Sequence, residues 1–82
     1  MAARVLMLGR LADVAGWRER PLDPLPARLF ALRAQLAAED ARLGEALAGP
    51  GVQAAVDRAV VRGDAPLPPG CEVAFLPPMS GG

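Results

Sequence analysis

The sequence contains no histidine, no lysine and only one cysteine, Cys71. Without histidine, and with a single thiol, one chain cannot build a Cys/His zinc site, a Cys–His catalytic pair or an internal disulfide. We therefore expect a chain that binds no cofactor and works in a reducing compartment. A lone cysteine at the start of a strand is usually a small buried hydrophobic residue, and we predict this role for Cys71.

The charged residues are balanced, and all of the basic ones are of one kind. Nine arginines, spread from Arg4 to Arg62, face nine acidic residues, so the net charge is zero. A neutral chain without a clustered basic face lacks the footprint that binding to a phosphate backbone requires, so we expect no nucleic-acid partner. Because lysine is missing, no side-chain amine of this chain could accept an isopeptide bond.

Long apolar runs are missing as well. The N-terminal run at residues 5–8 is interrupted by Gly9 and Arg10, which makes it too short for a signal-sequence core or a membrane span. We expect no membrane partner and a cytoplasmic location.

The length of 82 residues allows one small domain, in which about 60% of the unfolded chain's surface would be buried. Hydrophobic residues make up 52% of the sequence and charged residues 22%, which is enough apolar material for a core and argues against disorder. The sequence therefore predicts a folded module.

Two stretches near the N-terminus favour strands. The apolar run at residues 4–8 suits a strand that is buried on both faces, as at the centre of a sheet. Residues 11–15 fit either one helical turn or a loop. Residues 18–22 predict a weaker strand at an edge of the sheet, where Pro21 is tolerated because an edge has spare donors.

A leucine stripe predicts the main helix. The helix should begin at Pro26, whose missing N–H costs nothing at the first helical position. The spacings of four, three and four residues place the stripe on one face, and its members are Leu25, Leu29, Leu32 and Leu36. Leu43 and Leu47 mark a second short helical piece.

The second half of the chain predicts strands separated by turns. A turn at residues 49–51 precedes β-branched stretches at residues 52–56 and 60–61, and residues 71–76 form the last strand. This order predicts an α+β fold in which one main helix crosses one face of a mixed sheet.

The chain ends in a segment that reads Phe75-Leu76-Pro77-Pro78-Met79-Ser80-Gly81-Gly82. The prolines stiffen it in an extended form, and the glycines give it a tip without side chains. The α-carboxylate of Gly82 is therefore a handle that an enzyme could thread through a narrow channel and activate. The alternative is a disordered tail, as chain ends often are.

These residues resemble the small subunit of molybdopterin synthase, the MoaD-type sulfur carriers. Residues 70–82 are similar to that family's ending, G-D-E-V-A-F-x-P-P-V-x-G-G, and residues 5–16 and 54–67 are similar to its opening and central segments. The chain departs from the pattern at three positions, which are Asp57 for the usual Asn, Cys71 for an acidic residue and Met79 for Val.

The resemblance implies a ubiquitin-like β-grasp domain at residues 1–76 and an extended Gly-Gly arm at residues 77–82. It implies that an adenylating enzyme of the ubiquitin-activating type uses ATP to adenylate Gly82, the residue that follows Gly81. A persulfide donor then supplies sulfur, and the resulting thiocarboxylate passes it to the pterin precursor of the molybdenum cofactor. This last step occurs in the large subunit of a heterotetrameric synthase, so the chain itself contributes no general base or metal.

The resemblance also implies partner-binding residues. Val60 and Leu76 match an apolar docking patch for the adenylating enzyme and the large subunit, although Val60 could equally serve ordinary sheet packing. The arm would lie in partner channels, and its residues before the glycines are Pro77, Pro78, Met79 and Ser80.

Three other functions stay open. The chain could be a ubiquitin-like modifier that is conjugated through Gly82 to lysines of target proteins. It could carry sulfur for another pathway, such as thiazole or tungsten-cofactor assembly. It could also be a plain interaction module, for which loss of Gly81 and Gly82 would change nothing.

Overall fold

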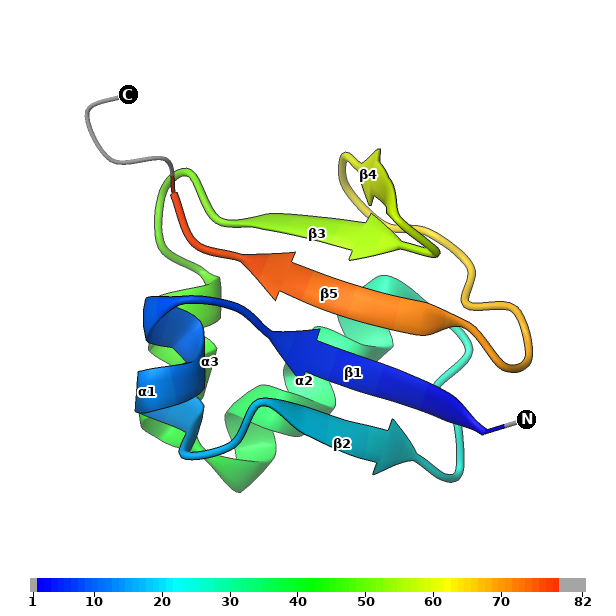
Figure 1. The fold of residues 1–82 in the computed structure, drawn as a ribbon, viewed down its shortest axis with the longest axis horizontal. Coiled ribbons are helices and arrows are strands. Elements are labelled where there is room, and N and C mark those ends of the chain that lie inside the picture. The colour runs from blue at the N-terminus through cyan, green and yellow to red at the C-terminus, as the bar shows by residue number, and fades with distance from the viewer. Residues whose placement is uncertain (1, 79–82) are drawn as a thin grey trace.

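Five strands form one mixed sheet in the computed structural model of the chain, which describes residues 2–78 (Figure 1). The spatial order is β2-β1-β5-β3-β4, with β1 and β5 parallel and the other neighbouring pairs antiparallel. The strands are β1 (Ala3–Met7), β2 (Glu19–Leu22), β3 (Gln53–Val56), β4 (Ala59–Val61) and β5 (Glu72–Leu76). This arrangement confirms the predicted α+β class and β-grasp fold.

The main helix of the described chain lies behind the sheet in Figure 1 and covers one of its faces, and the shorter helices lie toward the end of the sheet at which the first strand ends. The helices are α1 (Arg10–Ala15), α2 (Leu29–Glu39) and α3 (Ala41–Leu47). The core between the two layers contains the leucines of α2 and α3 and the inward residues of β1 and β5, which are Leu29, Leu32, Leu36, Leu43, Leu47, Val5, Met7, Val73 and Phe75. The predicted leucine stripe is therefore core packing. Among residues 2–78, no helix is long and apolar enough to cross a membrane.

The predicted start of the main helix at Pro26 is wrong, because α2 begins at Leu29. The residues just before it are held in extended pairing by a distant segment. Arg28 forms a bridge with Pro66, and the N–H of Leu67 donates to the carbonyl of Ala27. Leu25 is partly buried but precedes the helix.

The expectation that the first strand is buried on both faces is also wrong. Burial in β1 alternates, with Val5 fully buried and Arg4 exposed, because the helices cover only one face of the sheet. The weaker strand was placed correctly, since β2 is an edge strand and contains Pro21. Residues 11–15, for which a helical turn or a loop was possible, belong to α1.

Candidate functional site

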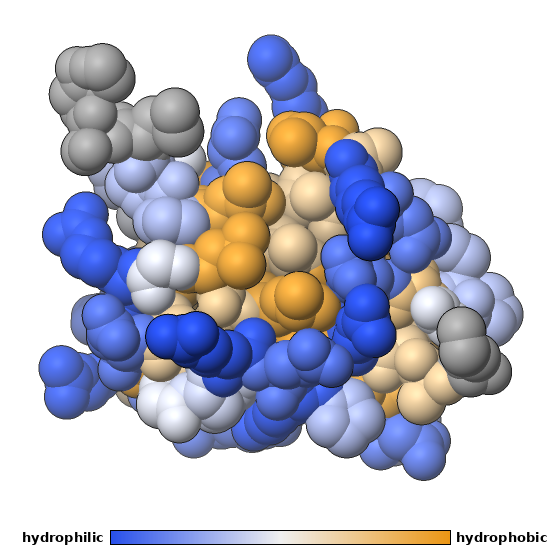
Figure 2. All heavy atoms as spheres, viewed as in Figure 1, coloured by the Kyte–Doolittle hydropathy of each residue, from blue (hydrophilic) through white to orange (hydrophobic). Residues whose placement is uncertain are grey.

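The face of the sheet that is not covered by helices is largely apolar at its centre (Figure 2). In strand register, Leu6 of β1 lies beside Ala74 of β5, which lies beside Ala55 of β3, which in turn lies beside Val60 of β4. Leu76 lies on the same face of the sheet as this row, because it is two residues from Ala74 on the same strand. We call these five residues the open-face patch.

The two residues predicted to dock partners, Val60 and Leu76, thus share one face of the molecule. The side chain of Val60 is 53% exposed, whereas the neighbouring Val61 packs against the core. Because the side chain of Val60 is exposed, the core does not depend on it, and it is available for an interface. Whether a partner binds to the patch stays a prediction.

One end of the open face carries a charged cluster. The Nη2 atom of Arg4 lies 2.7 Å from a carboxylate oxygen of Glu72, and its Nε atom lies 3.9 Å from Glu19. The hydrogen bond to Glu72 is the main reason that the pKa of Arg4 is raised. These exposed pairs add little stability, but they mark a polar edge beside the apolar patch.

The C-terminal arm leaves the sheet between two glycines. An added Cβ at Gly9 would lie 2.9 Å from Cγ of Pro77, and one at Gly51 would lie 2.7 Å from Cβ of Pro78. Both distances are too short for a real contact, so the proline rings occupy space that only glycine leaves. We call Gly9 and Gly51 the glycine cradle.

The cradle is built from loops that are far apart in the sequence. Gly9 precedes α1 and has a φ of +53°, and Gly51 precedes β3 and has a φ of +81°. Figure 1 shows the end of β5 beside the loop that leads into β3. The cradle therefore fixes the position from which the arm departs. The other predicted arm residues, Met79, Ser80, Gly81 and Gly82, lie outside the described residues.

The cradle could not be found from the sequence, where Gly9 and Gly51 indicate only the end of a strand and a turn. Their contact with the arm depends on β5 lying between the strands that these loops flank. The available signal was the pair of prolines, since two rigid rings need open space beside them.

Cys71 is buried, with 2% of its surface exposed. Burial, and then the nearby charge of Asp57, raise the pKa of the thiol. The thiolate is the reactive form of cysteine, so these surroundings make Cys71 a poor nucleophile at neutral pH. Its burial agrees with the prediction of a small hydrophobic residue.

The departure from the family pattern at Asp57 preserves a structural contact. Oδ1 of Asp57 accepts a hydrogen bond of 2.9 Å from the N–H of Glu72, and the N–H of Asp57 donates to the carbonyl of Glu72. Asp and Asn both supply the side-chain acceptor that this contact needs. The positive φ of 49° at Asp57 and of 71° at Arg58 belongs to the turn between β3 and β4.

The model of the ThiS family matches residues 5–82 of the chain. The chain shares its fold with solved structures of proteins to which it is less than 25% identical. SAMP1 from Haloferax volcanii has a TM-score of 0.82 at 21% identity, with 100% of both chains covered. The small archaeal modifier protein 1 (SAMP1) from Methanosarcina acetivorans has a TM-score of 0.76 at 19% identity, over 98% of this chain and 95% of the other.

A third structure is that of a Pyrococcus furiosus protein proposed to be subunit 1 of the molybdopterin converting factor. It has a TM-score of 0.71 at 24% identity, over 96% of this chain and 99% of the other. No curated protein matches the sequence significantly.

Proposed function

Because the chain belongs to the ThiS family, we propose that it is a sulfur carrier whose working group is the carboxylate of Gly82. The observation that carries this proposal is the extent of the family match, which runs from residue 5 through Gly81 and Gly82. The fold supports it, because β5 leads directly into the prolines of the arm. Two glycines, which have no side chains, at the end of a folded domain suit delivery of one reactive group into a partner's active site.

The proposed chemistry proceeds in two steps. A C-terminal carboxylate is ionised at neutral pH, with a pKa of roughly 3.5, and is therefore a poor electrophile. In the first step a partner enzyme joins it to the AMP portion of ATP and releases pyrophosphate. In the second step sulfur from a persulfide donor displaces AMP, and reduction of the resulting acyl disulfide by a thiol leaves the thiocarboxylate.

The chain's own contribution is positioning. In this proposal the open-face patch docks against the adenylating enzyme and then against the sulfur acceptor. The glycine cradle holds Pro77 and Pro78, so that the remaining residues of the arm, Met79 and Ser80 among them, reach a partner channel from a fixed origin. ATP is bound by the partner enzyme, and no cofactor is assigned to the chain itself.

We assign the carrier to molybdopterin synthase, as its small subunit. The resemblance of residues 70–82 to the ending of that family supports this assignment, as does the fold shared with the Pyrococcus furiosus protein. The partners are then the large synthase subunit, an adenylating enzyme of the ubiquitin-activating type and a persulfide donor. The assembled synthase is a heterotetramer.

The assignment is tested by reconstituting the synthase. The thiocarboxylated chain is mixed with the large subunit and the cyclic pterin precursor, and dithiolene formation is followed. We expect product from the thiocarboxylated chain and none from the unmodified chain or from one that lacks Gly82. Failure with a large subunit that is active with its own carrier would overturn the pathway, whereas failure to form the thiocarboxylate would overturn the carrier chemistry itself.

Conjugation to proteins is the second candidate. It is favoured by the shared fold with two structures of SAMP1, one of which is described as a small archaeal modifier protein. An activated Gly82 could form an amide with a target lysine in place of a thiocarboxylate. Since the chain has no lysine, conjugates would carry single copies rather than chains linked through its own side chains. Mass spectrometry of tryptic peptides would reveal target lysines that bear the C-terminal residues of this chain.

A further inference from the structure

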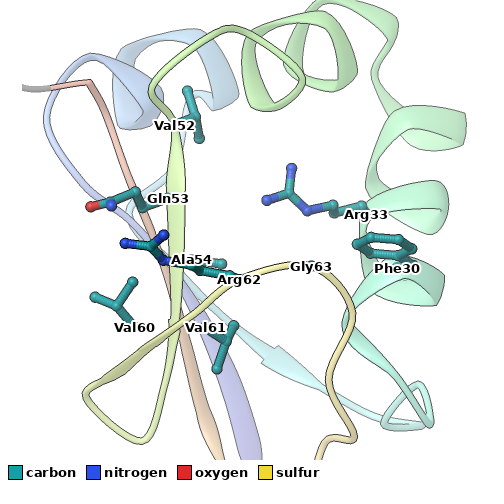
Figure 3. Close-up of a pocket in the computed structure, with 9 residues that line it drawn as sticks. All are labelled: Phe30, Arg33, Val52, Gln53, Ala54, Val60, Val61, Arg62 and Gly63. Carbon is teal, nitrogen blue, oxygen red and sulfur yellow. The ribbon is translucent and has the colours of Figure 1, made fainter.

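A groove separates α2 from the hairpin of β3 and β4 (Figure 3). Its volume is about 610 Å³. Its rims include Phe30 and Val60, each of which is 53% exposed. These two side chains give the groove apolar surface that a bound partner could bury.

Arg33 reaches from α2 across this groove toward β3 (Figure 3). Its Nη1 atom donates a hydrogen bond of 2.9 Å to the carbonyl of Leu47, and its guanidinium lies 5.3 Å from the centre of the Phe75 ring. The Nε atom is buried and has no hydrogen-bond partner among the described residues. Burial lowers the pKa of Arg33, as expected for a cation that lacks a neighbouring carboxylate.

Arg62 lines the same groove. Three arginines of the described chain, Arg4, Arg20 and Arg28, form ion pairs with carboxylates, and the other six do not. Arg33 and Arg62 have no carboxylate within 4.0 Å in residues 2–78. The groove thus combines apolar walls with two positive charges that the described chain does not neutralise.

We propose that this groove binds an extended segment of a partner protein, in which one acidic side chain is flanked by bulky apolar residues. The carboxylate would accept hydrogen bonds from Arg33 and face Arg62, while the apolar residues would cover Phe30 and Val60. An extended segment suits this chemistry because side chains two residues apart on an extended chain point to the same face, so one acidic side chain and the apolar side chains two residues before and after it can enter the groove together.

The groove adjoins the open-face patch through Val60, which belongs to both surfaces. One partner could therefore occupy the patch and reach around β4 into the groove. The proposal does not require chemistry at Gly82, since none of the arm residues lines the groove among those described. It can fail or hold independently of the proposed sulfur-carrier function.

The test uses the full-length, isotope-labelled chain and the probe peptide acetyl-Leu-Ile-Asp-Val-Leu-amide, with a matched peptide that contains Asn in place of Asp. Amide chemical shifts are followed by NMR up to millimolar peptide. We expect changes centred on α2, β3 and β4, and weaker binding of the Asn peptide. Absence of shifts, or equal binding of both peptides, would overturn the proposal.

Three variants assign the interaction. Arg33→Gln and Phe30→Ala should each weaken binding of the probe by about tenfold, because each removes a charged or apolar contact. Arg42→Gln is the matched control, since it removes the same charge from an arginine that does not line the groove, and should bind as the unaltered chain does. Phe30 is exposed, so its variant keeps the test decisive if Arg33→Gln does not fold. Unchanged affinity in both groove variants would contradict the site.

Discussion

The carboxylate of Asp64 caps a helix from a distant part of the chain. Residue Arg28 precedes α2 and provides no side-chain cap. Instead, Oδ1 of Asp64 accepts hydrogen bonds of 2.9 Å from the N–H groups of Phe30 and Ala65, and Oδ2 lies 2.8 Å from Nε of Arg28. One side chain therefore satisfies an N–H of the first helical turn and ties α2 to the loop before β5.

We predict that Asp64→Ala lowers the melting temperature at pH 7 by about 5 °C, because the helix start loses its cap. The hydrogen bond from Arg28, followed by that from Phe30, lowers the pKa of Asp64. A lowered pKa stabilises the fold above the unfolded value of roughly 3.9, and this stabilisation is lost as the pH falls through the folded value. The difference between variant and unaltered chain should therefore shrink below about pH 4.

Thermal unfolding followed by circular dichroism at pH 7 and at acidic pH checks this prediction. Glu45→Ala is the control, because Glu45 is exposed, lies outside the first turn of α3 and makes no side-chain hydrogen bond or ion pair within residues 2–78. An equal effect of both substitutions, or a difference that persists undiminished in acid, would contradict the capping role.

At the scale of elements, the glycine cradle connects the start of α1 and the start of β3 to the end of β5. Both glycines have positive φ, so any substitution strains the backbone even where space is available. Gly63 separates strain from crowding, because its φ is +75° and nothing lies within 4 Å of an added Cβ. Gly51, with a similar φ of +81°, has Pro78 at 2.7 Å.

We predict that Gly51→Ala and Gly63→Ala both lose about 1 kcal/mol of stability, whereas only Gly51→Ala displaces the arm. If the adenylating enzyme requires an accurately placed terminus, its ATP–pyrophosphate exchange should fall at least about tenfold with Gly51→Ala and change little with Gly63→Ala. NMR shifts of the residues around Pro78 provide a readout that does not depend on enzyme activity. Equal behaviour of the two variants in both measurements would mean that the cradle does not position the arm.

For the whole molecule, the sequence predicted what depends on neighbouring residues and missed what depends on distant ones. The leucines of α2, the edge strand with Pro21 and the last strand follow from local spacing and composition. The start of α2 was misplaced because Arg28 pairs with Pro66, a contact that only the folded chain creates.

The candidate site divides in the same way. The resemblance to the sulfur-carrier family predicted that Val60 and Leu76 belong to one apolar patch, and the sequence ending indicated the arm. The cap from Asp64 and the groove around Arg33 were not predicted, because each combines residues from segments that are far apart in the sequence. Such contacts leave no periodic pattern from which they could be inferred.

At the scale of the whole molecule, we predict that the adenylating enzyme docks on the open-face patch. Val60→Glu should weaken binding to the adenylating enzyme by at least about tenfold, because it places a charge within an apolar contact. Ala31→Glu adds the same charge at an exposed position of α2, behind the sheet, and should bind normally. Titration calorimetry with the purified enzyme distinguishes them, and equal affinities for the two variants would exclude this face as the docking surface.

The central claim is that Gly82 carries sulfur, and the most direct measurement is the intact mass of the chain after incubation with the adenylating enzyme, ATP, a persulfide donor and a reducing thiol. We predict a gain equal to the replacement of one oxygen by one sulfur in the full-length chain, and no gain in a chain that lacks Gly82. An unchanged mass in the presence of an enzyme that thiocarboxylates its own carrier would contradict the account.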